Sequence, residues 1–363
     1  MALSTRPGIS SSQYIPSLDG LRAISIALVV FGHSCGSQGF PIPLSPRIEQ
    51  VARYGVQVFF VISGFLITTL LLKEQKISLR KFYFRRSLRI LPAVYSYILV
   101  IAVAAFVLHW VSLAPSDVVR ASLFVSNYHF ANPWVVGHLW SLSTEEQFYL
   151  VWPCLLAILG RRFAMVPALF AATFAFITFV VTHLYPPAHG WHLWNSFPGG
   201  MNSIGTGCVL ALVKSKIRVH WLVATAGILT VPLAIWFAYN IRIYVPFERF
   251  SSFGIALFIA WAIDNGSKSL VGKLLNLQPV RWLGLISYSL YLWQMPFLNR
   301  EVASVWTSFP LNLVLAFVFA CMSFYFIEKP FLRLRMKAES QLWPKRNEEI
   351  KASHEPLALA QSK

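Results

Sequence analysis

Long apolar runs recur along the whole chain, and short polar segments separate them. Each run is close to the roughly 20 residues that an α-helix needs to cross the hydrocarbon core of a bilayer. The sixth and eighth runs are short and give the weakest signal. The pattern predicts ten membrane-spanning helices, at residues 21–37, 54–72, 91–111, 145–160, 163–184, 199–213, 219–239, 249–264, 283–298 and 310–328.

The composition also points to a membrane protein. Of the 363 residues, 56% are hydrophobic and only 12% are charged, whereas about a quarter of the residues in a soluble domain are charged. We therefore expect an all-α, polytopic integral membrane helix bundle in a lipid bilayer. The net charge of +17 does not require nucleic acid as a partner, because basic cytoplasmic loops explain it more simply. The four cysteines lack a metal-ligand spacing, so no metal site is predicted.

The basic residues favour one orientation of the predicted bundle. If the N-terminus is cytoplasmic, 25 of the 31 Lys and Arg residues fall in cytoplasmic segments and six fall outside. Positive residues collect in the cytoplasmic loops of membrane proteins, so both termini are predicted to be cytoplasmic. We expect a cytoplasmic N-terminal tail at 1–13, a transmembrane domain at 14–335 and a disordered, mixed-charge cytoplasmic tail at 336–363.

The first predicted helix carries polar residues at both ends. It begins with Asp19 and Arg22 and holds His33 near its other end. Arg22 and His33 return to nearly the same helix face, about 16 Å apart along the axis. A histidine within an apolar helix is costly unless it faces protein or water, so it is a candidate functional residue. The alternative is a structural histidine whose hydrogen bonds are satisfied at a helix end.

The most basic segment, LRKFYFRRSLRILP, follows the second predicted helix. Arg86 and Arg89 are three residues apart, so on a helix they point the same way. Two guanidinium groups on one face suit a phosphate group, which each can bind through two hydrogen bonds. The alternative is an ordinary cytoplasmic cluster that contacts anionic lipid head groups.

Two carboxylates open the fourth predicted helix, in HLWSLSTEEQFYLVWP. Ser143 and Glu146 have the spacing of a capping box, which favours a structural role for Glu146. Glu145 is predicted at about the depth of His33, with Tyr149 one turn further along. We expect Glu145 either to orient the imidazole of His33 or to occupy a helix start that the helix dipole favours.

Six motifs occur in order along residues 14–331: SLDGLRAISIALVVFGH, FFVISGFLI, FRRSLRILP, HLWSLSTEEQFYLVWP, ISYSLYLWQMPF and FIEKPF. Together they resemble acyltransferase family 3, the membrane-bound O-acyltransferases of bacterial surface polysaccharides. In the fifth motif, Tyr288, Tyr291 and Gln294 have the spacing of a polar stripe on one helix face. Many relatives have histidine where this chain has Gln294, so we do not expect an obligatory acid or base at that position.

The resemblance implies an acyl-CoA donor, with acetyl-CoA as the default, acting as a co-substrate without any bound cofactor. The family's arginine-to-histidine spacing falls on Arg22 and His33, and its RxxR motif falls on Arg86 and Arg89. The arginines are then expected to bind the phosphates of cytoplasmic acyl-CoA. The pantetheine arm would thread between helices and present the thioester near His33.

The implied acceptor is a carbohydrate hydroxyl on an envelope or exported glycan. His33 is expected to be its general base, and a covalent acyl-histidine is the alternative. The family's acidic motif falls on Glu145 and Glu146, and Glu145 would hold the His33 imidazole in the productive tautomer. Four residues are expected to support the site: Asp19, Glu146, Tyr149 and Tyr291.

The resemblance also implies a multi-pass protein of the bacterial inner membrane. It would either complete the transfer itself or hand its acyl group to separate glycan-assembly proteins. Two functions of other classes stay open: a glycan or small-molecule transporter (a flippase), and a scaffold without chemistry. The two halves show no internal repeat, which weakens the transporter hypothesis. A requirement for acyl-CoA that involves Arg86 and Arg89 would separate the enzyme from both.

Overall fold

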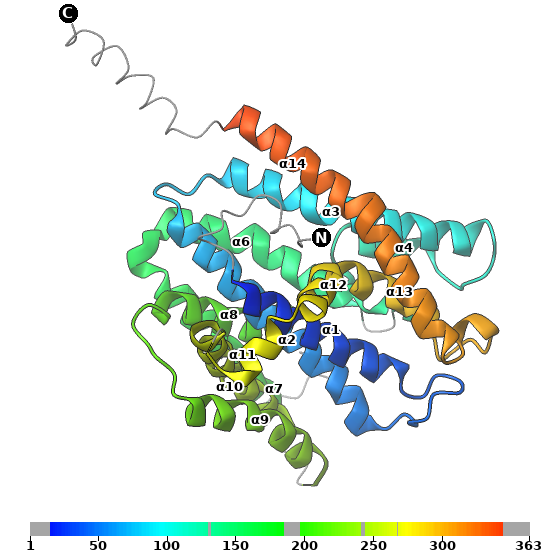
Figure 1. The fold of residues 1–363 in the computed structure, drawn as a ribbon, viewed down its shortest axis with the longest axis horizontal. Helices are drawn as coiled ribbons and strands as arrows, with labels where there is room; N and C mark the ends of the chain where they lie inside the picture. The colour runs from blue at the N-terminus through cyan, green and yellow to red at the C-terminus, as the bar shows by residue number, and fades with distance from the viewer. Residues whose placement is uncertain (1–14, 130–131, 185–196, 241–243, 267, 344–363) are drawn as a thin grey trace, which may run out of the picture.

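The computed structural model describes the chain outside residues 1–14, 130–131, 185–196, 241–243, 267 and 344–363 (Figure 1). Within these limits the elements are helical and no strand occurs, which confirms the all-α class. The long helices are α1 (Pro16–Ser34), α2 (Pro46–Lys73), α3 (Leu79–Phe106), α6 (Leu139–Phe163), α7 (Met165–Leu184), α8 (Phe197–Val213), α9 (Trp221–Asn240), α10 (Tyr244–Asn265), α12 (Gln278–Phe297), α13 (Leu311–Ser323) and α14 (Lys329–Leu342). The short ones are α4 (Pro115–Ser122), α5 (Trp134–Gly137) and α11 (Leu270–Leu275).

Local sequence signals set several helix ends. The hydroxyls of Ser45 and Ser78 each accept a hydrogen bond at 3.4 Å from the backbone N–H three residues later, and so cap α2 and α3. Near the end of α6, Gly160 has a φ of 71°, a conformation that favours glycine. The chain bends there by 119° between the helices that end at Phe163 and begin at Met165. α6 and α7 therefore point in very different directions.

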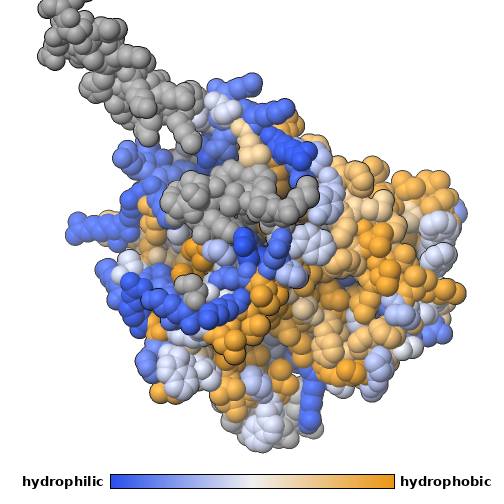
Figure 2. Space-filling model, viewed as in Figure 1, coloured by the Kyte–Doolittle hydropathy of each residue, from blue (hydrophilic) through white to orange (hydrophobic). Residues whose placement is uncertain are grey.

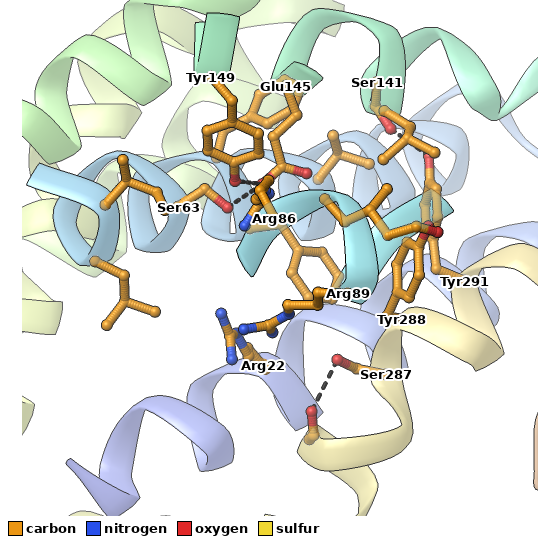
Figure 3. Close-up of a pocket in the computed structure, with 18 of the residues that line it drawn as sticks. Arg22, Ser63, Arg86, Arg89, Ser141, Glu145, Tyr149, Ser287, Tyr288 and Tyr291 are labelled. Atoms are coloured by element: carbon orange, nitrogen blue, oxygen red, sulfur yellow. Dashed lines mark hydrogen bonds and ion pairs between the residues drawn. The ribbon is translucent and has the colours of Figure 1, made fainter. Parts of the chain in front are cut away.

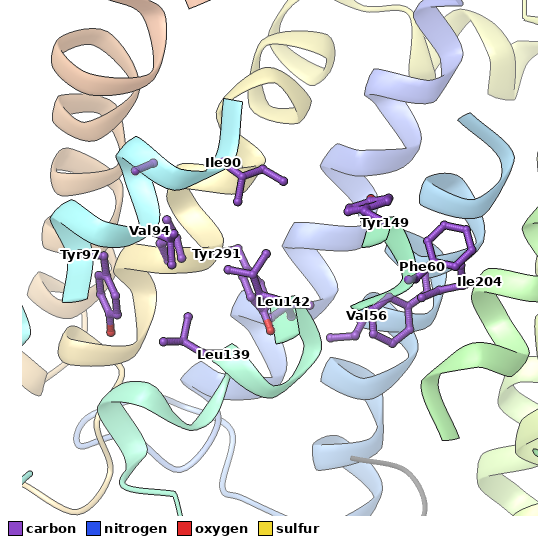
Figure 4. Packing of buried hydrophobic residues seen from close by; sticks show 14 of the residues in the cluster. Val56, Phe60, Ile90, Val94, Tyr97, Leu139, Leu142, Tyr149, Ile204 and Tyr291 are labelled. Atoms are coloured by element: carbon purple, nitrogen blue, oxygen red, sulfur yellow. The ribbon is translucent and has the colours of Figure 1, made fainter. Parts of the chain in front are cut away.

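The helix α1 packs against α2 and α12. α12 approaches closely at Gly284, where a Cβ atom would lie 1.9 Å from the backbone oxygen of Asp19. A side chain at this position would therefore push the two helices apart. Buried apolar residues from α2, α3, α6, α8 and α12 fill the adjoining core (Figure 4), among them Phe60, Val94 and Leu142. This packing fixes the places of α1, α2, α3, α6 and α12 relative to one another.

Several described helices are long and apolar enough to cross a membrane. Three pass on length and composition alone, at Arg47–Lys73, Leu79–Phe106 and Leu311–Leu342. The bent pair of Trp134–Phe163 and Met165–Phe174 adds a fourth if it counts as one span. On the face in Figure 2, hydrophobic side chains cover much of the right-hand part, while hydrophilic ones gather around the end of α14 at the upper left. Each of the ten predicted spans overlaps a long helix, but the count of ten stays a prediction.

The C-terminal region corrects one expectation. Residues 336–342, which we predicted to be disordered, belong to α14. There, Glu339 accepts a hydrogen bond from Arg85 and lies 4.0 Å from the ammonium group of Lys81. Glu339, one of the charges that suggested a solvated tail, thus has ionic partners on α3. The predicted tail at 1–13 and the last part of the predicted tail at 336–363, from 344 onward, lie outside the described residues.

Candidate functional site

Two cavities, at opposite ends of α1, hold the predicted site residues other than Asp19 and Glu146. The first has a volume of about 170 Å³ and is called here the arginine cavity (Figure 3). Its lining includes Arg22, Arg86, Arg89, Glu145, Tyr149 and Tyr288. The second has a volume of about 370 Å³ and is called here the histidine cavity. Its lining includes His33, Glu49, Arg53, Trp134, His138 and Arg300.

Arg86 is compensated by partners inside the protein. Its Nη2 atom lies 3.7 Å from Oε1 of Glu145, and its Nε atom lies 3.7 Å from Oε1 of Glu146. Its guanidinium carbon lies 3.3 Å from the centre of the Tyr149 ring, in a cation–π contact. Only 15% of the Arg86 side chain is exposed. Two carboxylates and one aromatic face therefore surround this charge.

Arg22 and Arg89 form a second basic group in the arginine cavity. Arg22 lies 3.7 Å from the carboxylate of Asp19, one helical turn earlier on α1. Figure 3 shows the guanidinium groups of Arg22 and Arg89 pointing toward one another. The structure thus brings the three predicted arginines to one cavity. It associates Arg86 with carboxylates, however, and brings Arg89 toward Arg22.

Glu145 does not contact His33 as predicted. Ser63 and Tyr149 donate hydrogen bonds to its carboxylate, which also faces Arg86. Glu145 lines the arginine cavity, whereas His33 lines the histidine cavity. The reason is the start of α6, which lies at Leu139 and puts Glu145 nearly two turns inside the helix. The estimate of equal depth assumed a helix that began near Glu145.

The same early start of α6 excludes the predicted capping box. The Ser143 hydroxyl donates to the backbone oxygen of Leu139 at 2.9 Å, so Ser143 lies within α6 and is not its N-cap. No acidic residue occupies the first turn of α6, which also excludes the helix-start role for Glu145. The polar residues of the WSLST segment looked like a loop in the sequence. Glu146 instead contributes a charge beside Arg86.

Tyr291 and Val56 line both cavities, so the cavities adjoin at these residues. The Tyr291 hydroxyl donates to the backbone oxygen of His138 at 2.7 Å and lies 2.5 Å from the hydroxyl of Ser141. Its ring meets that of Phe59 edge-on, with 6.4 Å between centres. These contacts tie the Tyr291 side chain of α12 to α2 and to the start of α6.

His33 meets uncharged groups in the histidine cavity. Its Nδ1 atom lies 3.3 Å from Oε1 of Gln294, and its ring meets that of Trp134 edge-on at 5.9 Å. Arg300 donates to the backbone oxygens of Gly32 at 2.8 Å and of His33 at 3.3 Å. The end of α1 is therefore held by a guanidinium group, while the imidazole itself contacts an amide and an indole.

Sequence reasoning did not single out Trp134, His138 or Arg300. Trp134 precedes the HLWSLSTEEQFYLVWP motif, and His138 is its first residue. Arg300 is one of only six basic residues predicted outside the cell. This rarity was the signal in the sequence that could have singled it out. The stripe of Tyr288, Tyr291 and Gln294 does face inward, since their polar groups bond to Ile90, His138 and His33 respectively.

A family model described as an acyltransferase domain matches residues 15–329. The chain belongs to acyltransferase family 3. This confirms the family that the six ordered motifs resemble, over nearly the same residues. No solved structure matches the family 3 chain.

Several relatives of this family 3 chain are named O-acetyltransferases. It is 29% identical to the peptidoglycan O-acetyltransferase OatA of Listeria monocytogenes, over 88% of this chain and 56% of the relative. It is 30% identical to the putative peptidoglycan O-acetyltransferase YrhL of Bacillus subtilis, over 88% and 55%. It is 28% identical to the O-acetyltransferase OatA of Staphylococcus aureus (strain MRSA252), over 93% and 60%. The chain thus spans a little more than half the length of these relatives.

Proposed function

We propose that the protein is a membrane O-acetyltransferase that moves an acetyl group from cytoplasmic acetyl-CoA to a hydroxyl of a cell-envelope glycan. The observation that carries the proposal is that a basic cavity and an imidazole-containing cavity adjoin at Tyr291 and Val56. A donor site and an acceptor site that meet in this way suit transfer between the two sides of a membrane. The names of the relatives favour acetyl as the transferred group and a glycan as the acceptor.

Acetyl-CoA is the proposed ligand of the arginine cavity. Its phosphates are anionic, and Arg22 and Arg89 offer planar donors that can each bind a phosphate through two hydrogen bonds. Arg86, which faces Glu145 and Glu146, would help to hold the wall of the cavity beside the donor. The apolar side chains that also line this cavity would contact the pantetheine arm.

His33 is the proposed general base. A hydroxyl is a poor nucleophile until a base takes its proton, and a neutral imidazole is suited to this task. The acceptor sugar would occupy the histidine cavity, where Trp134 and Trp140 offer aromatic faces. A nucleophilic His33 that carries the acetyl group is the mechanistic alternative. Glu145 would hold Arg86 in place and take no part in orienting His33.

The proposed topology has ten spans, with both termini in the cytoplasm of a bacterial inner membrane. Arg22 precedes His33 on α1, so the arginine cavity would lie nearer the cytoplasm, where acetyl-CoA is made. The division of 25 to 6 among the basic residues supports this orientation. Glycan-assembly proteins are the proposed partners, either to present the acceptor or to take the acetyl group onward.

Alkali-labile acetate on purified envelope glycans tests the proposal. The strains to compare lack the gene or carry the wild type, His33→Ala or His220→Ala at matched protein level. His220 is exposed between α8 and α9, outside both cavities, and serves as the control. We expect acetate to disappear on deletion, to return with the wild type and His220→Ala, and to stay absent with His33→Ala. Unchanged acetate with less surface glycan would instead support a transporter, and full acetate with His33→Ala would exclude the proposed base.

A further inference from the structure

The His33 imidazole has a hydrogen-bond partner whose orientation is itself fixed. Gln294 on α12 is fully buried, and its Oε1 atom lies 3.3 Å from Nδ1 of His33. Its Nε2 atom donates to the backbone oxygen of Tyr291 at 3.3 Å, one turn earlier on the same helix. A backbone carbonyl oxygen can only accept, so the amide nitrogen of Gln294 must face Tyr291. The amide oxygen therefore faces His33.

This orientation determines where the imidazole carries its proton. An amide oxygen has no proton to give, so the hydrogen bond forms only if Nδ1 of His33 is protonated. In a neutral imidazole the other nitrogen, Nε2, then has the free lone pair. We infer that Gln294 is a positioning residue that holds the proton on Nδ1 and leaves Nε2 of His33 as the basic atom.

The inference rests on the proposed function and deepens it by naming the reacting atom. The acceptor hydroxyl gives its proton to Nε2 as its oxygen forms a bond to the acetyl carbonyl carbon. The carbon–sulfur bond of the thioester breaks, and CoA leaves as a thiolate that takes the proton back from Nε2. Gln294 stays neutral throughout, so it adds no negative charge that would hold the imidazole protonated between turnovers, as a carboxylate would.

The rest of the surroundings place the imidazole without choosing its tautomer. Arg300 holds the backbone at Gly32 and His33, and its guanidinium carbon lies 4.9 Å from the centre of the Trp134 ring. Trp134 in turn donates to the backbone oxygen of Met295 at 3.1 Å and contacts the His33 ring edge-on. Replacing Gln294 should therefore change which nitrogen of His33 carries the proton more than it changes the position of the ring.

Other charged and titratable groups also line the histidine cavity and face the imidazole from several elements. They are Glu49 and Arg53 on α2, His138 before α6, Tyr291 on α12, and Arg300 and Glu301 after α12. These groups are unchanged in every variant of the test, so they form a constant background. A difference between the Gln294 variants then reports on the partner of Nδ1.

The kinetic test compares Gln294→Glu, Gln294→Met and the control Gln147→Glu. Gln147 lies on α6 outside both cavities and donates to the backbone oxygen of Phe124. Acetyl transfer from acetyl-CoA to alkali-treated envelope glycan is measured in nanodiscs from about pH 5 to pH 9. In Gln294→Glu the carboxylate favours the protonated imidazole, so the acidic limb of the rate profile should move up by about 1–3 pH units. Gln294→Met should lower kcat roughly 10- to 100-fold with the KM for acetyl-CoA unchanged.

Nitrogen NMR of histidine-labelled protein reads the tautomer without turnover, with the spectrum of His33→Gln subtracted to identify the signal. We expect a protonated Nδ1 and a bare Nε2 in the wild type. A protonated Nε2 would overturn the inference, as would a Gln294→Glu profile that coincides with those of Gln147→Glu and the wild type. A wild type that shows the expected tautomer but transfers no acetyl group would overturn the proposed function and leave the assignment of the proton standing.

Discussion

The arginine cavity and the histidine cavity differ in the charge of the groups that contact Arg86 and His33. In the arginine cavity, Arg86 faces two carboxylates and an aromatic ring within 4 Å. In the histidine cavity, the ring of His33 contacts an amide and an indole, and the nearby guanidinium group of Arg300 binds the backbone. Arg22 and Arg89, which point toward one another in the arginine cavity, suit the binding of an anion. Neutral contacts suit the proposed base, which must begin each turnover uncharged. In the proposed function, donor binding therefore belongs to one end of α1 and proton transfer to the other.

The largest effect on stability is expected where a compensated charge loses its partner. Glu145→Ala should leave Arg86 undercompensated and lower the free energy of unfolding by about 3–5 kcal/mol. Glu49→Ala is the matched change in the histidine cavity, because Glu49 is 55% exposed and lies 3.9 Å from Arg300. It should cost less than about 1 kcal/mol. Denaturant titration in detergent measures both, and equal losses would contradict the contrast between the cavities.

A smaller effect, on donor binding, should be confined to the arginine cavity. Arg22→Gln or Arg89→Gln should raise the KM for acetyl-CoA roughly 10- to 100-fold, since each removes a charged hydrogen bond to phosphate. Arg85→Gln is the control, because Arg85 neighbours Arg86 in sequence but contacts Glu339 and does not line the cavity. We expect its KM to stay near the wild-type value in a steady-state assay. A rise as large as that for Arg89→Gln would favour an unspecific basic cluster at the lipid surface.

The smallest effect is expected at the shared wall between the cavities. Tyr291→Phe keeps the ring and removes a hydroxyl that bonds to His138 and Ser141, a loss of about 1 kcal/mol or roughly fivefold in kcat. Tyr83→Phe is the matched control, because its hydroxyl also donates to a backbone oxygen, that of Leu150 on α6, outside both cavities. Measured kcat values should separate the two variants. Equal values would mean that the Tyr291 contacts serve packing alone.

The sequence predicted the features that depend on a residue's own stretch of chain. The apolar runs anticipated the long helices because the length of a run is a direct signal for a span. The motifs likewise selected Arg22 and Arg89, which line the arginine cavity, and His33, which lines the histidine cavity. The order of residues within one helix was enough to select these three, because helical periodicity determines which side chains share a face.

The failed predictions depend on which helices meet. Glu145 was assigned to His33, but the close approach of α12 to α1 at Gly284 brings Gln294 to the imidazole instead. In the sequence, residues 336–342 look like part of a tail. In the structure they are helical, and Glu339 accepts a hydrogen bond from Arg85 on α3. Such pairings lie hundreds of residues apart in the chain, and no spacing rule encodes them.

Transfer of radiolabelled acetyl from acetyl-CoA to alkali-treated envelope glycan tests the central claim most directly. The assay uses purified protein in nanodiscs and compares the wild type with His33→Ala and His220→Ala, with acetyl-CoA binding measured in parallel by equilibrium dialysis. The account predicts equal binding by the three proteins, labelled glycan with the wild type and His220→Ala, and none with His33→Ala. Labelling by His33→Ala at the wild-type rate would contradict it.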